Sequence, residues 1–81
     1  MKHYTYRVMI EPDENNTYHA WVPGLPGCHT WGDSLEEVRR NARDAIQAYL
    51  SNLAETDAPI PEQNGFEYFE TLAETEIRQQ R

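Results

Sequence analysis

Apolar and polar residues alternate in the N-terminal part of the chain, with the two-residue period of a half-buried strand. Between residues 4 and 11, the positions expected on one face are Tyr4, Tyr6, Val8 and Ile10. The run at 12–16 is rich in Asn and Asp, which tolerate positive φ and form turns, and residues 17–22 alternate again. Residues 28–31 can form a third short strand after the Pro- and Gly-rich loop at 23–27. The pattern predicts three antiparallel strands joined by turns.

A long amphipathic helix is predicted after the third strand. Ser34 and Glu37 have the spacing of a capping box, in which each side chain accepts a hydrogen bond from a backbone N–H at the helix start. Apolar residues then recur at helical spacing, at Leu35, Val38, Ala42, Ala45, Ile46, Tyr49, Leu50 and Leu53. We therefore expect one helix over about residues 35–55, with its apolar side on the sheet.

The C-terminal segment after the loop at 56–65 fits two structures. A helix would place Phe69, Leu72, Ala73 and Ile77 on one face, whereas a strand would align Phe69, Thr71, Ala73, Thr75 and Ile77. Its aromatic and threonine content favours a fourth strand near residues 67–77. The expected fold is a single α+β domain over residues 1–81, with an antiparallel sheet in β-β-β-α-β order and the helix packed on one face.

Charge narrows the classes of partner. The chain carries 14 acidic and 7 basic residues, a formal net charge of -7. Direct binding to nucleic acid is disfavoured, because affinity for phosphates depends on positive charge, whereas a basic protein would be attracted. Between Glu55 and Ile77 there are seven acidic residues and no basic one. The alternative explanation of the negative charge is that it only keeps a small domain soluble.

The compartment is predicted from cysteine content and hydropathy. Cys28 is the single cysteine, which rules out an intrachain disulfide and fits a reducing compartment. The N-terminus has no continuous apolar region, and no stretch approaches the roughly 18 apolar residues of a membrane helix. We expect a cytoplasmic protein with no membrane association. Because a domain this small leaves sheet edges to protect, we also expect a homo-oligomer, a dimer or higher.

The order of the motifs resembles the HicB-like antitoxin domain. The resemblance covers nearly the whole chain and rests on Glu11-Pro12-Asp13, Val22-Pro23, Leu25 to Thr30, Gly32-Asp33-Ser34 with Glu36-Glu37, Asn41 to Ile46, and Ala58 to Pro61. It implies a truncated RNase H-like fold in β-β-β-α-β order. It also implies a partner, the small basic RNA-cleaving toxin HicA, which the antitoxin would bind and neutralise. Many members carry a C-terminal DNA-binding module. Only residues 78–81 follow the predicted fourth strand, so direct DNA binding by this chain is not expected.

Catalysis and metal binding are not expected. An RNase H-like nuclease needs carboxylates that converge on two metal ions about 4 Å apart, but turn and capping roles account for the candidates Glu11, Asp13, Glu14, Asp33, Glu36 and Glu37. The possible zinc ligands lack the usual spacing, and adjacent residues on a strand face opposite sides. These ligands are His3, His19, Cys28 and His29. We predict no catalytic residue, no metal site and no cofactor.

Two tryptophans and two histidines are the candidate partner-binding residues. His19, Trp21, His29 and Trp31 take alternate positions on two successive strands and can share one face. That face is either an interface, where aromatic residues dominate the binding energy, or the face on which the helix packs. Attraction to a basic toxin would come from the acidic C-terminal region, including Glu67, Glu70 and Glu74.

Three hypotheses follow for the function. The first is a non-enzymatic antitoxin that covers a HicA-like toxin. The second is a metal-dependent nuclease with residual RNase H-like activity, and the third is a stand-alone oligomeric scaffold.

Overall fold

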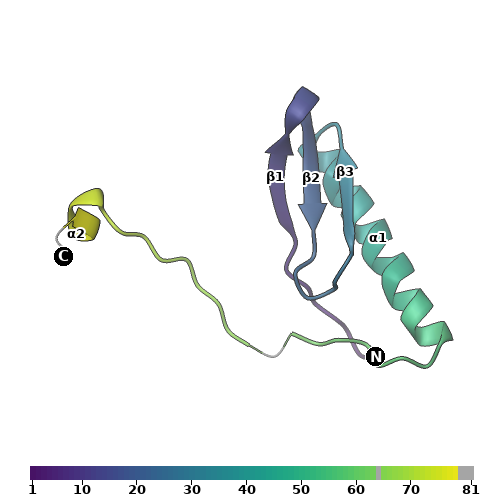
Figure 1. The fold of residues 1–81 in the computed structure, drawn as a ribbon. Coiled ribbons are helices and arrows are strands. Elements are labelled where there is room, and N and C mark those ends of the chain that lie inside the picture. The colour runs from purple at the N-terminus through teal and green to yellow at the C-terminus, as the bar shows by residue number, and fades with distance from the viewer. Residues whose placement is uncertain (64, 79–81) are drawn as a thin grey trace.

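The computed structural model describes residues 1–63 and 65–78 as a three-stranded antiparallel sheet with one long helix against it (Figure 1). Each strand pairs with its neighbour in sequence, and the register places Ile10 opposite Ala20 and Ala20 opposite Thr30. The elements are β1 (Met9–Asp13), β2 (Thr17–Trp21), β3 (His29–Gly32) and α1 (Leu35–Glu55). The α+β class, the three strands and the helix predicted from the sequence are confirmed.

The turn between β1 and β2 has the chemistry that its Asn and Asp content predicts. A single 3₁₀ turn, η1 (Glu14–Asn16), joins the strands, with φ values of 66° at Asn15 and 62° at Asn16. The Asp13 carboxylate accepts a hydrogen bond from the backbone N–H of Glu14 at 2.8 Å. Asparagine tolerates this left-handed region better than most residues, so the turn forms without glycine.

The loop between β2 and β3 is closed by the backbone and anchored by one leucine. Hydrogen bonds of 3.0 Å run from Val22 N to Cys28 O, from Leu25 N to Val22 O, and from Cys28 N to Leu25 O. Leu25 is fully buried, and Gly27 provides the positive φ of 83° that the turn requires. The loop therefore returns the chain to the sheet and contributes to the core.

The start of α1 is fixed on the end of β3. The Ser34 hydroxyl accepts from the N–H of Glu37 at 3.0 Å, which confirms the predicted cap. The Glu37 carboxylate reaches one residue further back than in a standard capping box and accepts from the N–H of Asp33 at 2.6 Å. Both bonds hold the chain as it turns from the strand into the helix.

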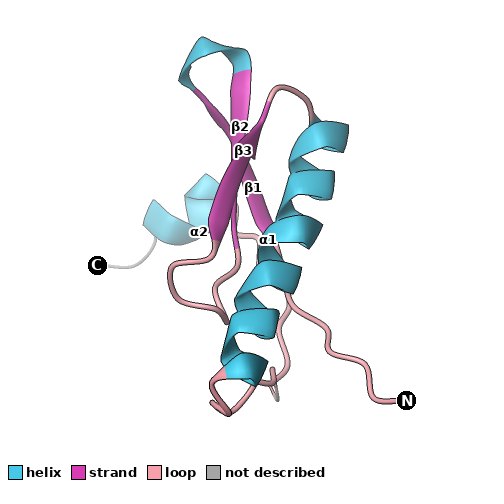
Figure 2. Ribbon diagram, turned by 90° about the vertical axis from the view of Figure 1, so that its right-hand side faces the viewer, coloured by secondary structure: helices cyan, strands magenta, loops and turns pink. Residues whose placement is uncertain are grey.

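The core lies between α1 and the sheet, and Figures 1 and 2 show α1 lying against the sheet, where it contacts β2 and β3. Its buried residues are Ala20, Val22, Leu25, Cys28, Val38 and Ala42. Tyr6, Val8 and Ile10 pack against this core but remain partly exposed, because the helix does not extend over β1. No described helix is long and apolar enough to cross a membrane.

The first strand is shorter than predicted at its beginning. Residues 4–8 alternate as expected but form no ladder, and pairing starts at Met9, which lies opposite Trp21. Beyond Trp21 the chain leaves the sheet in the loop that follows Val22, so the residues before Met9 have no neighbouring strand in the structure.

The predicted fourth strand at 67–77 is wrong. Among residues 65–78, hereafter the tail, the structure contains no strand and one short helix, α2 (Glu74–Arg78). Figure 1 shows the tail leading away from the sheet. A strand needs a partner for its backbone groups. Residues 68–73 pair with no strand in the described part of the chain, so their β-forming composition is not sufficient. The helical alternative holds only for the last turn.

Candidate functional site

The two tryptophans and two histidines gather on the face of the sheet that points away from α1. The register pairs His19 of β2 with Trp31 of β3, and Trp21 with His29. Ala20, which alternates with these residues, is buried against the helix. The structure therefore excludes the interpretation that this face is the one on which the helix packs. We call His19, Trp21, His29 and Trp31 the aromatic face.

The rings of the aromatic face are stacked on one another. His19 lies between the two indoles, with centroid distances of 4.7 Å to Trp31 and 5.4 Å to Trp21. His29 meets His19 and Trp31 edge-on at 5.6 Å and 5.0 Å. These separations lie in the range where aromatic pairs attract. A partner would meet a surface that is already ordered.

Hydrogen bonds from outside the cluster fix Trp31. Its indole N–H donates to the Asp13 carboxylate at 3.1 Å, and its carbonyl accepts from the Asn41 side-chain amide at 2.7 Å. The side chain nevertheless remains 47% exposed. Among the described residues, His19 Nε2 is buried without a hydrogen-bond partner, so no hydrogen bond to this nitrogen helps to position the ring.

The three predicted glutamates do not join the aromatic face. They lie on the tail, where Glu67 forms an ion pair with Arg7 and Glu74 forms one of 2.8 Å with Arg78. Glu70 is exposed and makes no ion pair within the described parts of the chain. The structure brings the four rings together and leaves these carboxylates on a separate segment.

The residues considered for metal or acid–base chemistry are dispersed. Within 1–63 and 65–78, no three His, Cys, Asp or Glu side chains are grouped so that they could hold a metal ion. Glu36 faces Arg40 one helical turn away, and Glu37 caps α1. Cys28 points into the core, where burial raises the pKa of its thiol. A raised pKa disfavours the thiolate that nucleophilic catalysis or metal ligation needs.

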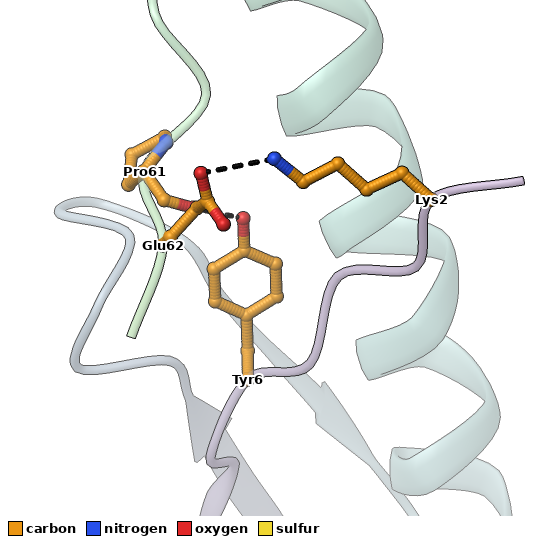
Figure 3. Close-up of polar contacts among 4 residues, drawn as sticks. All are labelled: Lys2, Tyr6, Pro61 and Glu62. Atoms are coloured by element: carbon orange, nitrogen blue, oxygen red, sulfur yellow. Dashed lines mark hydrogen bonds and ion pairs between the residues drawn. The ribbon is translucent and has the colours of Figure 1, made fainter. Parts of the chain in front are cut away.

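Sequence reasoning missed a set of contacts between the N-terminal residues and the loop after α1. The Tyr6 hydroxyl donates to the Pro61 carbonyl at 2.5 Å, and Lys2 pairs with Glu62 at 3.2 Å (Figure 3). The Gln63 side chain accepts from the N–H of Arg7 at 2.7 Å. Burial raises the pKa of the Tyr6 phenol. The partners are 55 to 60 residues apart, so no local pattern could predict them.

The fold is a small α+β domain, and an ordered cluster of aromatic side chains lies on the face of its sheet opposite the helix. Residues 6–78 match the family model described as HicB-like antitoxin of bacterial toxin–antitoxin systems. Because the match covers most of the chain, the protein belongs to the HicB-like antitoxin family.

Similar proteins occur in distant organisms. The chain is 38% identical to a UPF0150 protein of Synechocystis over 75% of its own length and 77% of that protein. A UPF0150 protein of Thermoplasma acidophilum is 40% identical over 76% of the chain and 90% of that relative. Among solved structures, the N-terminal domain of the antitoxin HicB from Burkholderia pseudomallei matches with a TM-score of 0.62 and 23% identity, covering 90% of this chain and 79% of that one. This last similarity confirms the fold.

Proposed function

We propose that the protein is a non-enzymatic antitoxin that binds and neutralises a small, basic, RNA-cleaving toxin of the HicA type. Family membership supports an antitoxin role. The observation that carries the proposed mode of binding is the aromatic face, an ordered set of rings on the exposed side of the sheet.

The tryptophans are suited to provide the binding energy. Trp and Tyr dominate interface hot spots because they bury a large area with little loss of conformational freedom. Stacking on His19 and the bond to Asp13 already restrict Trp31, so less entropy is lost when a partner covers it. We propose that His19, Trp21, His29 and Trp31 contact the toxin directly.

Attraction between opposite charges would bring the toxin to this surface. The net charge of -7 produces a field that accelerates encounter with a basic protein. Glu67, Glu70 and Glu74 contribute to that field whether or not they touch the toxin, because long-range attraction depends on total charge. Glu67 and Glu74 already pair within the chain, which makes a steering role more suitable for them than a direct contact.

The remaining parts of the proposal are a cytoplasmic location, self-association, and no direct contact with DNA by residues 1–81. The net negative charge supports the last point, since phosphate binding depends on positive charge. The absence of enzymatic activity is tested by incubating the purified protein with RNA and Mg²⁺ or Mn²⁺. Cleavage abolished by substitution of this chain's carboxylates would establish the nuclease hypothesis instead.

The test of the binding surface is calorimetric titration against a purified basic toxin of the HicA type. Trp21→Ala and Trp31→Ala should each weaken binding by about 2 kcal/mol, roughly 30-fold in Kd. Leu35→Ala is the matched control, because Leu35 is a similarly exposed apolar side chain on α1. Folded tryptophan variants that bind and protect cells as well as the control would exclude the aromatic face as the toxin site.

A further inference from the structure

The tail exposes large apolar side chains that no described part of the chain covers. Phe69 is 98% exposed and Tyr68 is 82% exposed, and the group also includes Phe66, Leu72 and Ile77. The radius of gyration is 16.8 Å, compared with about 12 Å for a compact domain of this length. Large apolar groups held in water raise the free energy of the chain and usually mark a binding segment.

An open groove lined by both apolar and polar side chains lies between the N-terminal residues and α1. It has a volume of about 700 Å³ and exists because the helix covers β2 and β3 but not β1. Its apolar lining comes from both sides, with Tyr4, Val8 and Ile10 on one and Ala42, Ile46 and Leu50 on the other. β1 is also an edge strand whose outer backbone groups have no partner strand in the described structure.

The charges of the groove and the tail are opposite. Arg39 and Arg43 line the groove and form no ion pair within the described residues. The tail carries Glu70 and Glu76, which likewise form no ion pair there. The apolar side chains of the tail therefore match the apolar part of the groove lining, and the acidic side chains of the tail match its arginines.

The tail of the same chain is held away from this groove. Gly65, Phe66 and Glu67 lie beside Thr5 and Arg7, and Glu67 pairs with Arg7. On an extended chain Thr5 and Arg7 point to the side opposite Val8 and the other groove residues. After this contact the tail continues away from the sheet (Figure 1). None of the described tail residues lines the groove of its own chain in this structure.

Length also permits exchange between two copies. Residues 68–73, which precede α2, span about 20 Å when extended, and residues 2–10, which border the groove, span about 30 Å. A reciprocal arrangement, in which each copy inserts its tail into the other, would satisfy both grooves and close the assembly at two chains.

We propose that the groove is the docking site for residues 68–77 of a second copy of this chain, with Phe69 and Leu72 as the main apolar contacts. The dimer forms by mutual exchange of tails. This inference does not depend on the toxin, and the aromatic face remains uncovered on the other side of the sheet.

The first test measures the molar mass of the full chain by light scattering and sedimentation. The unmodified protein should be a dimer. Phe69→Asp and Leu72→Asp should weaken dimerisation roughly 30-fold or more, and neither should unfold the domain, because both side chains are exposed in the single chain. Thr71→Asp is the matched control, since it adds the same charge between these positions without removing an apolar group. A monomeric unmodified protein, or Asp variants that dimerise like the control, would overturn the proposal.

The second test distinguishes exchange between copies from folding back within one copy. Chains with Leu72→Cys are mixed with differently tagged chains carrying Gln47→Cys, which lines the groove, while native Cys28 remains buried. Oxidation should join the two kinds of chain. Ala48→Cys is the control partner, because it is exposed and lies 100° further around α1, away from the groove. Equal crosslinking of the Gln47→Cys and Ala48→Cys chains would refute the exchange. A further variant carries both Leu72→Cys and Gln47→Cys in one chain, and a disulfide that forms only within that chain would refute it as well.

Discussion

The Trp31 side chain is exposed to solvent and yet held in one position by its neighbours, which makes the aromatic face suitable for binding. A bond from its indole N–H, a bond to its carbonyl and the stacked His19 ring hold it from three directions. Asp13 serves two purposes here, because one carboxylate oxygen accepts from Trp31 and the other accepts from the N–H of Glu14 in the turn. One residue at the end of β1 therefore links turn geometry to the binding surface.

Replacing Asp13 should reveal this link. Asp13→Ala removes both acceptors and should lower the free energy of unfolding by about 1–2 kcal/mol, together with a weaker affinity for the toxin because Trp31 is less restricted. Asp13→Asn retains an acceptor oxygen and should lose less of both. Urea denaturation and the NMR signal of the Trp31 indole N–H provide the measurements. An unchanged indole signal in Asp13→Ala would show that stacking and the Asn41 bond fix the residue without Asp13.

Cys28 gives a prediction about alkaline pH. Burial raises the pKa of its thiol above the ordinary value of 9.0. The folded state therefore keeps the proton at pH values where the unfolded state has lost it, so the free energy of unfolding should decrease as pH rises through about 9. Denaturant titrations between pH 8 and pH 10, which bracket that value, should show this decrease. The slope should be smaller in Cys28→Ala, and a slope identical in both proteins would contradict the assignment to Cys28.

At the scale of elements, the junction between β3 and α1 depends on one glycine. A Cβ placed on Gly32 would lie 2.6 Å from the backbone nitrogen of Val38, closer than any normal contact. Gly32→Ala must therefore push the helix away from the strand, and we expect a loss of roughly 1–3 kcal/mol of stability. Gly65→Ala is the control, because a Cβ there meets nothing within 4 Å. Thermal unfolding of the two variants compares them directly, and equal midpoints would contradict the close packing.

The elements that the sequence predicts correctly are those whose signal is local. The period of Val38, Ala42 and Ile46 defines α1, and Ser34 defines its first turn. The predicted strand at 67–77 failed because a strand depends on a partner strand, which a local pattern does not reveal. The late start of β1 has the same cause, since residues 4–8 have the right alternation but no strand to pair with among the described residues.

The candidate site could be predicted only in part. Alternation correctly placed His19, Trp21, His29 and Trp31 on one face. It could not determine which side of the sheet the helix would cover, because this depends on the path of the chain from Gly32 into α1. The groove beside β1 was also beyond sequence reasoning, since it results from the lateral position of the helix relative to the three strands.

At the scale of the whole molecule, the two proposed surfaces lie on opposite sides of the sheet. The aromatic face points away from α1, whereas the groove lies between α1 and the N-terminal residues. A dimer formed through the groove would leave two aromatic faces free and would therefore bind two toxin molecules. It would also double the formal charge from -7 to -14, the sum of two chains, which strengthens attraction to a basic partner.

Charge and contact should act on different steps of toxin binding. The association rate should fall as salt rises, because ions screen attraction over about 10 Å at 0.1 M ionic strength. The variant Glu67→Gln/Glu70→Gln/Glu74→Gln changes the formal charge from -7 to -4 by removing three negative charges. It should associate more slowly at low salt with little change in dissociation, whereas Trp31→Ala should mainly accelerate dissociation. Surface plasmon resonance across a salt series separates the two rates, with the assembly state of each variant checked by light scattering. If the glutamine variant retains the full association rate and salt dependence, the three glutamates do not steer the toxin, and the attraction must come from the remaining acidic residues of the domain.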